Sequence, residues 1–229
     1  MCPLELYNRD EIRAAKRISN PGCYATSTQL LVAPLLAHLA PGAFPTVFGV
    51  SGYSGAGTVT GPPAADGRPT TAPKVTPESL AGGFRPYALT DHIHEREAGR
   101  HLSRLPAAAG GAVRVAFTPS VAPWFSGILS VLSLPLAGGR VTAREVRELY
   151  EARYAGERLV RVQTDVVTLP DVERQHGWAV GGFQVHSQGD RAVVVVSLSG
   201  FRVVGVVANQ GCRVVWTTCS RARPRSVCR

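Results

Sequence analysis

A long apolar run behind a Pro-Gly turn constrains the fold of this 229-residue chain more than any other stretch. The segment reads ISNPGCYATSTQLLVAPLL, and its apolar residues continue to about Leu39. A run of a dozen apolar residues that contains a proline and a histidine is too short to span a bilayer. It therefore predicts a core helix from about Tyr24 to Leu39, with Cys23 at its first turn.

Two interpretations of Cys23 stay open on these residues alone. Unpaired N–H groups and the positive end of the dipole at a helix start favour a thiolate, which would make Cys23 a nucleophile. A single cysteine beside an apolar run is, however, more often a small buried hydrophobic residue. Of the five cysteines, only Cys23 lies in sequence that resembles a folded domain, because Cys2 is at the start and the others lie beyond residue 199. This pattern is not a disulfide framework and favours a reducing compartment.

Helical and strand-like segments are mixed along the rest of the chain, which predicts a mixed α/β or α+β domain without internal repeats. A helix at 141–156 is marked by a capping box of Thr142 and Glu145 and by Gly156 at its end. A shorter helix is expected at 8–17, and a Gly-, Pro- and Thr-rich loop at 51–73. The expected strands are residues 44–52, 111–121, 126–136, 158–164, 178–187 and 190–199, with a hairpin turn at 187–190 between the last two.

The formal charge of +9 would suit a nucleic-acid-binding protein, but its distribution argues against that function. Six arginines lie beyond Ser199 with no acidic residue or lysine among them, and removing them lowers the charge from +9 to +3. The basic character therefore belongs to the terminal segment 199–229, which we expect to be disordered. Neither a signal peptide nor a membrane span is expected.

Two further segments could carry chemistry. TDHIHEREAGRHL, Thr90 to Leu102, contains His92, His94 and Glu97. Two histidines at i and i+2 followed by acids could bind a metal or act as a general base oriented by a carboxylate, but a solvated polar helix start explains them equally well. No third and fourth ligand are visible, so no metal site is expected. SGYSGAG, residues 51–57, has small residues that would let a ligand approach, although a flexible loop is its default interpretation.

The motifs NPGCYAT, VSGYSGAG, PYALTDHIHEREAGRHLS and FTPSVAPWFSGIL follow one another in this order. Together they resemble N-acetyl-γ-glutamyl-phosphate reductase, a family of arginine biosynthesis. The resemblance is closest to the fungal form, which is made with acetylglutamate kinase as one mitochondrial precursor. It runs from about Leu6 to about Leu198. It implies an α+β, mixed-sheet catalytic and dimerisation domain of the semialdehyde-dehydrogenase type, which we place at residues 23–198.

The resemblance also implies roles for individual residues. Cys23 would attack the acyl phosphate of N-acetylglutamyl 5-phosphate and form a thioester, which NADPH would reduce to the semialdehyde. The family's H-x-H-x-x-E pattern falls on His92, His94 and Glu97. We expect His92 to be the acid/base, with His94 as the next candidate. The expected binding residues are Glu97, Arg96 and Arg100 for the substrate, and Ser54, Gly55, Ala56 and Gly57 for the nicotinamide end of NADPH.

Two departures from the family affect the expected function. The sequence has no glycine-rich nucleotide fingerprint, and an unrelated basic tail follows residue 198. We therefore expect the Rossmann nucleotide-binding domain to be missing, with residues 1–22 a remnant of the link to it. Two functions stay open: an NADPH-dependent oxidoreductase, or a non-catalytic remnant that cannot bind NADPH. The expected partners are a second copy of the chain and an acetylglutamate kinase, but neither nucleic acid nor membrane. The expected location is the mitochondrial matrix for a fungal protein and the cytoplasm otherwise.

Overall fold

The computed structural model describes residues 9–16, 21–67, 70–108, 111–138, 141–172, 175 and 177–198. Its centre is a seven-stranded sheet with the strand order β4-β5-β1-β6-β9-β8-β7. β1 pairs with β5 and β7 with β8 in parallel, and the other neighbours are antiparallel. This mixed sheet confirms the predicted α+β class. The strands are β1 (Thr46–Gly52), β4 (Arg85–Pro86), β5 (Ala116–Ala122), β6 (Ile128–Pro135), β7 (Val160–Val162), β8 (Trp178–Val185) and β9 (Arg191–Leu198).

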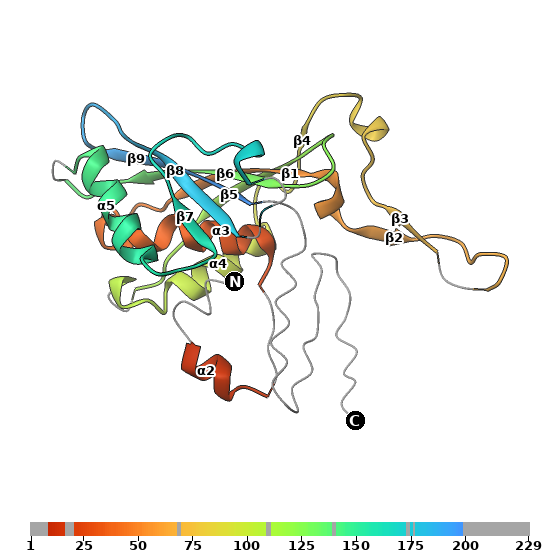
Figure 1. Cartoon of the computed structure of the whole chain (residues 1–229), viewed down its shortest axis with the longest axis horizontal. Helices are drawn as coiled ribbons and strands as arrows, with labels where there is room; N and C mark the ends of the chain where they lie inside the picture. The colour runs from red at the N-terminus through yellow and green to blue at the C-terminus, as the bar shows by residue number, and fades with distance from the viewer. Residues whose placement is uncertain are drawn as a thin grey trace.

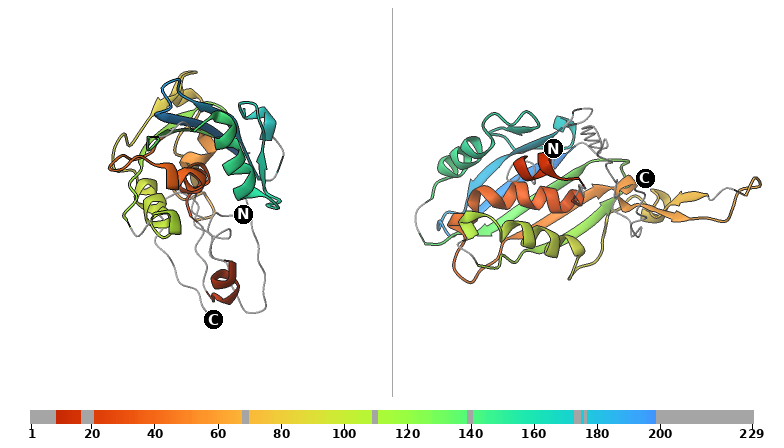
Figure 2. Two further views of the ribbon diagram at one scale, coloured as in Figure 1. Left: turned by 90° about the vertical axis from the view of Figure 1, so that its left-hand side faces the viewer. Right: turned by 90° about the horizontal axis from the view of Figure 1, so that it is seen from below.

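Three α-helices, α3, α4 and α5, pack on one face of this sheet, and in the end view the curved sheet lies over them (Figures 1 and 2). Within the described part of the chain, no α-helix covers the opposite face, although Val172 of the 3₁₀ segment η5 packs there on Ala179. The α-helices are α2 (Arg9–Ala14), α3 (Cys23–Val32), α4 (Ile93–Leu102) and α5 (Ala143–Tyr154). The 3₁₀ segments are η1 (Ala33–His38), η2 (Tyr53–Ala56), η3 (Glu78–Leu80), η4 (Pro106–Ala108) and η5 (Pro170–Val172).

The two faces of the sheet differ in burial because side chains alternate along each strand. Val47, Leu132 and Val194 point toward the helices and are fully buried. On the opposite face Phe48 is paired in register with Val131, and Val131 with Val195 on the next strand. Phe48 is 38% exposed and Val131 is half-buried, whereas Val195 is buried. The face without helices therefore carries an apolar row, which we call the open-face row.

The predicted helix from Tyr24 to Leu39 is wrong in its second half. The α-helix ends at Val32, and the chain continues as the 3₁₀ segment η1. The physical reason is Pro34, which has no N–H and clashes with an α-helical carbonyl four residues earlier. Tyrosines of α5 bond to the carbonyls at this junction: the Tyr154 hydroxyl donates to the Leu30 carbonyl at 2.7 Å, and the Tyr150 hydroxyl donates to the carbonyl of Leu31.

Several local predictions are confirmed. Thr142 caps α5 in a capping box with Glu145, and Gly156 after the helix has φ 75°. The hairpin turn lies between β8 and β9, where the His186 N–H donates to the Arg191 carbonyl at 2.9 Å. The expected loop 51–73 is only partly irregular. Its strands β2 (Thr58–Thr60) and β3 (Thr71–Pro73) pair antiparallel and extend away from the body (Figure 1).

The helix α2 confirms a short helix near the start, and Arg9 in it forms an ion pair with Glu157 at 2.6 Å. The predicted domain limits at residues 22 and 198 stay predictions, and the segment 199–229 lies outside the described residues. Among the helices that are described, none combines the length and the apolar character needed to cross a membrane.

Candidate active site

Two helices begin at the same end of the sheet. α3 leads into β1 and α4 leads into β5, and these two strands are parallel neighbours. Each helix runs back along its strand, so both helix starts lie beyond the carboxyl ends of β1 and β5. Open α/β sheets bind ligands at such an edge. A hydrogen bond joins the two helix starts directly, because the Gly22 N–H donates to Glu97 Oε1 at 2.9 Å.

Cys23 is the first residue of α3, as the sequence predicted to within one residue. Gly22 is the N-cap, its carbonyl accepts from the Thr26 N–H at 2.9 Å, and no side chain caps the helix. The first turn contains no acidic residue, and Cys23 is half-buried. The thiol therefore lies at the positive end of a helix without a local carboxylate in the same turn, which favours a thiolate.

Gly22 is needed for space rather than for backbone freedom, since its φ of −63° and ψ of 151° suit any residue. A Cβ at this position would lie 2.7 Å from Cδ2 and 2.9 Å from Cε1 of His94, and closer still to Nε2. The imidazole of His94, which is only 3% exposed, thus packs directly on the residue before Cys23. The sequence predicted the Pro-Gly turn, but not that a histidine fills the space beside it.

His92 is the N-cap of α4 and acts through its side chain. Its Nδ1 accepts the backbone N–H of His94 at 3.2 Å. Neutral His92 must therefore carry its proton on Nε2, because a nitrogen that accepts a hydrogen bond cannot also hold the proton. The ring is half-buried and lies edge-on to His94, with 4.6 Å between the centroids, and 5.9 Å from the centroid of the Tyr87 ring.

Glu97 contacts both the start of α3 and a histidine of α4. While Oε1 accepts from Gly22, Oε2 lies 3.9 Å from Nε2 of His94. That separation is too long for a hydrogen bond but close enough for an ion pair when the imidazole is protonated. The predicted residues Cys23, His92, His94 and Glu97 are therefore brought together, whereas the roles assigned to them stay predictions.

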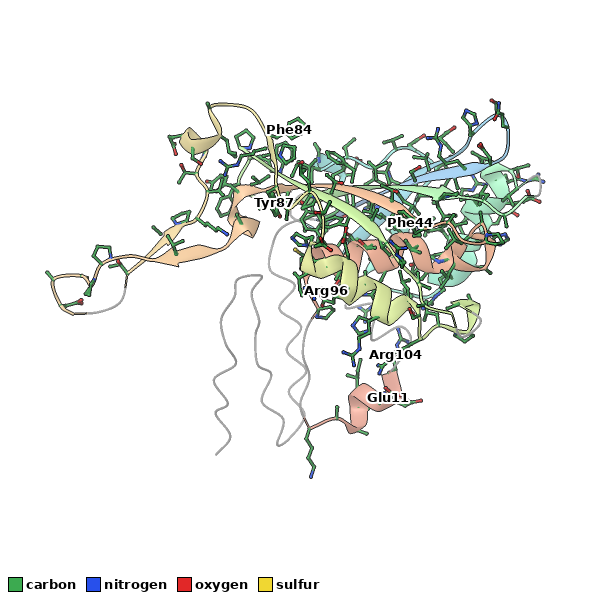
Figure 3. The ribbon with its side chains drawn as sticks, turned by 180° about the vertical axis from the view of Figure 1, so that it is seen from behind. Glu11, Phe44, Phe84, Tyr87, Arg96 and Arg104 are labelled. Atoms are coloured by element: carbon green, nitrogen blue, oxygen red, sulfur yellow. The ribbon has the colours of Figure 1, made fainter. Side chains whose placement is uncertain are left out.

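Arg96 and Arg100 lie on the outer side of α4 and are exposed. Figure 3 shows the Arg96 side chain extending from this helix, and that of Arg104 from the turn after it, away from the sheet. No ion pair within the described residues involves Arg96 or Arg100. Beside them, burial lowers the pKa of His101 below its ordinary value, and the nearby Glu97 carboxylate offsets only part of that effect.

The SGYSGAG segment lies at the end of β1, on the same edge of the sheet as both helix starts. Three backbone hydrogen bonds, from the N–H groups of residues 52–54 to the carbonyls of residues 124, 125 and 127, fix it to the turn between β5 and β6. Ser54 and Gly55 are exposed, and Ala56 and Gly57 are half-buried. Gly57 has φ 82°, a conformation that favours glycine. The loop therefore combines small residues with a backbone that is fixed to a neighbouring turn.

Tyr24 is a site residue that the sequence did not indicate. It is buried, its hydroxyl donates to the Ser120 carbonyl at 3.2 Å, and its ring lies 4.8 Å from that of Phe117. Gly49 of β1 gives the ring room, because a Cβ there would lie 2.9 Å from Tyr24 Cδ1. Tyr24 thus anchors the start of α3 to two strands. No group of three or more potential metal ligands occurs in the part of the chain that the structure covers.

A family model described as semialdehyde dehydrogenase, dimerisation domain, matches residues 23–199. A Candida albicans protein named as mitochondrial is 42% identical over 194 residues, and the Neurospora crassa protein arg-6, also named as mitochondrial, is 43% identical. Each alignment covers 85% of this chain and 20% of the relative. The N-acetyl-gamma-glutamyl-phosphate reductase of Xanthomonas axonopodis is 40% identical over 83% of this chain and 53% of the relative. The chain thus spans about half of this bacterial relative and a fifth of the fungal ones.

Solved structures share the fold. The aspartate semialdehyde dehydrogenase of Francisella tularensis matches with a TM-score of 0.61 and 14% identity, over 86% of this chain and 65% of that one. The aspartate semialdehyde dehydrogenase II of Vibrio cholerae matches with a TM-score of 0.58 and 15% identity, over 85% and 60%. At such low identity the likeness is one of fold alone, and it agrees with the mixed sheet described above.

Proposed function

Because this chain belongs to the semialdehyde dehydrogenase family through its dimerisation domain, we propose that it forms the catalytic and dimerisation part of a reductase of arginine biosynthesis. The proposed reaction converts N-acetylglutamyl 5-phosphate to N-acetylglutamate 5-semialdehyde. The relatives named N-acetyl-gamma-glutamyl-phosphate reductase support this substrate. The observation that carries the proposal is the position of Cys23 at a helix start, next to the Gly22 contact with Glu97 and His94.

Cys23 is the proposed nucleophile. Its thiolate attacks the acyl carbon, the bond from that carbon to the phosphate oxygen breaks, and inorganic phosphate leaves with the electron pair. A thioester on Cys23 remains, which divides one difficult reduction into two easier steps. Two helix starts at one edge of the sheet favour the anionic phosphate and thiolate, since each presents a positive dipole end. Exposed Arg96 and Arg100 add positive charge for attracting the substrate.

NADPH, when bound, supplies the hydride that reduces the thioester carbon. The nicotinamide end would lie against Ser54, Gly55, Ala56 and Gly57, whose small side chains and fixed backbone suit a flat ring. The pyrophosphate of a dinucleotide usually binds a glycine-rich turn at a helix start. The sequence contains no such turn, so this loop fits only one end of the cofactor.

His92 is the proposed acid/base. Reduction of the thioester leaves a thiohemiacetal on Cys23. Release of the aldehyde from it breaks the carbon–sulfur bond, removes a proton from the thiohemiacetal hydroxyl and returns one to the Cys23 sulfur. Because Nδ1 of His92 accepts from the His94 N–H, proton transfer would use Nε2. His94 is the next candidate, but its ring is buried against Gly22.

The acylation half-reaction tests this function without any nucleotide. The chain is mixed with N-acetylglutamyl phosphate, and phosphate release is measured together with the intact mass and the position of the adduct. We expect one N-acetylglutamyl group on Cys23 and none on the Cys23→Ser variant. An unmodified wild-type chain, or equal modification of the variant, would refute the proposal. A chain that acylates but never reduces with NADPH would support the non-catalytic alternative for this chain alone.

We also propose that two copies pack through their open faces. The open-face row of Phe48, Val131 and Val195 is apolar, and the matched family model is described as a dimerisation domain. Val131→Asp should shift the chain toward monomer in analytical ultracentrifugation, whereas Ala152→Asp, at an exposed position of α5 on the helix-covered side, should not. Equal behaviour of the two variants would contradict this interface.

Location and a further partner follow from the relatives and the resemblance. The fungal relatives are named as mitochondrial, so we propose the mitochondrial matrix if the chain is fungal. An acetylglutamate kinase partner is proposed on the resemblance alone. Co-purification from isolated mitochondria would test both, and recovery of the chain only in the cytosol would contradict the location.

A further inference from the structure

We propose that Glu97 is a positioning residue that fixes the peptide before the nucleophile, an inference that rests on the proposed role of Cys23. Its carboxylate accepts the N–H of Gly22 at 2.9 Å across 75 residues of sequence. The bond therefore joins α4 to the residue directly before Cys23. A role of this kind differs from direct substrate binding, because the Glu97 oxygen that faces Gly22 is already used within the protein.

The start of α3 has no side-chain acceptor of its own, and Glu97 supplies an acceptor for the N–H of its N-cap residue. Most helices are capped by a side chain at the N-cap position, but Gly22 has none. Its carbonyl is held within the helix by the Thr26 N–H at 2.9 Å. With Glu97 on the N–H and α3 on the carbonyl, both polar groups of Gly22 are fixed. The orientation of Cys23 relative to the positive end of the helix is thereby fixed as well.

The same carboxylate also adjoins the histidine. Oε2 lies 3.9 Å from His94 Nε2, while the His94 ring fills the space where a Cβ of residue 22 would be. Glu97, Gly22 and His94 thus contact one another pairwise. Movement of Glu97 would release the turn before Cys23 and the imidazole together.

Glu95 provides a matched control two residues earlier on the same helix. It also accepts a backbone N–H at 2.9 Å, but from Phe117 of β5 rather than from Gly22. Loss of either bond removes one contact between a carboxylate of α4 and a backbone amide. Only loss of the Glu97 bond frees the residue next to Cys23.

The test measures alkylation of Cys23 by iodoacetamide as a function of pH in the 229-residue chain, with the adduct mapped by mass spectrometry. Glu97→Gln and Glu97→Met both remove the negative charge and are close to glutamate in size. Only the glutamine keeps an oxygen that can accept from Gly22. The comparison between them therefore isolates the hydrogen bond, and the plateau rate at high pH corrects for access of the reagent.

We expect the midpoint of the rate profile to lie about 0.5 pH units higher in Glu97→Met than in Glu97→Gln, as expected for a thiolate that loses part of its helix-start stabilisation. Glu95→Met and Glu95→Gln should share one midpoint. Equal midpoints for the two Glu97 variants would overturn the inference. So would a midpoint difference between the two Glu95 variants as large as that between the Glu97 variants, because it would indicate general loosening of α4. Circular dichroism checks folding, and Glu97→Ala replaces the methionine variant if that does not fold. Alkylation needs no substrate, so failure of acylation alone would count against the proposed function and not against this role of Glu97.

Discussion

Replacing Tyr154 with phenylalanine should destabilise the chain by about 1–3 kcal/mol, the usual loss when a buried polar group is left without its hydrogen bond. Pro34 has no N–H, so the Leu30 carbonyl lacks a donor four residues later in the chain. The Tyr154 hydroxyl donates to that carbonyl at 2.7 Å from a side chain that is only 4% exposed. A phenyl ring would keep the apolar contacts of tyrosine, so the loss should reflect the hydrogen bond rather than a cavity.

The assay is equilibrium unfolding in urea followed by circular dichroism. Tyr53→Phe is the matched control, because the Tyr53 hydroxyl makes no hydrogen bond to another described residue, and it should change stability by less than about 0.5 kcal/mol. Pro34→Ala supplies a second test, since an alanine N–H at this position could donate to Leu30. In that background Tyr154→Phe should lose about 1 kcal/mol less than in the wild type.

Two results would refute this reasoning. Equal losses for Tyr154→Phe and Tyr53→Phe would mean that the buried hydroxyl contributes nothing measurable. An unchanged loss in the Pro34→Ala background would mean that the missing helical N–H is not what Tyr154 replaces.

Four other predictions concern the acid/base residue, the pH dependence of stability, the packing of α4 and the cofactor. In a version that also carries a nucleotide-binding domain, His92→Asn should lower turnover about 10²–10⁴-fold in steady-state assays without lowering the melting temperature. The reason is that asparagine caps a helix but transfers no proton. A loss below tenfold would move the role to His94 or water. Burial lowers the pKa of His101 from 6.5, so the stability that its neutral form contributes is present above pH 6.5 and lost as pH falls. The free energy of unfolding of His101→Gln in urea should therefore depend less on pH below 6.5 than that of the wild type. An equal dependence in both would contradict this. Gly99→Ala would place a Cβ 2.7 Å from the Val113 carbonyl oxygen and should destabilise by about 1–3 kcal/mol in urea, whereas a more stable variant would show that α4 can shift. Isothermal titration of this chain with NADPH should give no saturable binding at micromolar concentration, because the sequence lacks a glycine-rich phosphate turn, and saturation would contradict that.

Local patterns predicted those parts of the fold whose cause is local. The capping box of α5 lies within four consecutive residues, Thr142 to Glu145, and both of its hydrogen bonds are present. The end of α3 also has a local cause, Pro34, which the predicted helix to Leu39 did not take into account. The tyrosines that bond to the carbonyls at this break lie 119 and 124 residues from their partners, and no local pattern indicates them. β2 and β3 were missed because three-residue strands are too short to show an alternation of apolar and polar side chains.

The sequence identified the residues of the site but not the contacts between them. Residue reasoning left Cys23 open between a buried thiol and a nucleophile, and only the resemblance to a family favoured the second. The pattern H-x-H-x-x-E identified His92, His94 and Glu97 without indicating that one caps a helix, one packs on Gly22 and one binds its N–H. The two contacts with Gly22 join residues 72 and 75 positions apart, and no periodicity in the sequence encodes such a pairing.

The parallel register of β1 and β5 is what brings those distant segments together. Gly49 is paired with Pro119, and each strand follows a helix that starts at the shared edge. A slip of two residues between the strands would move α4 about 6–7 Å along α3, at roughly 3.3 Å per residue. That distance is more than twice the 2.9 Å between Gly22 N and Glu97 Oε1, so the contact would be lost. Residues that hold this register, including Tyr24 with its bond to the Ser120 carbonyl, therefore act on the site even where they touch no substrate.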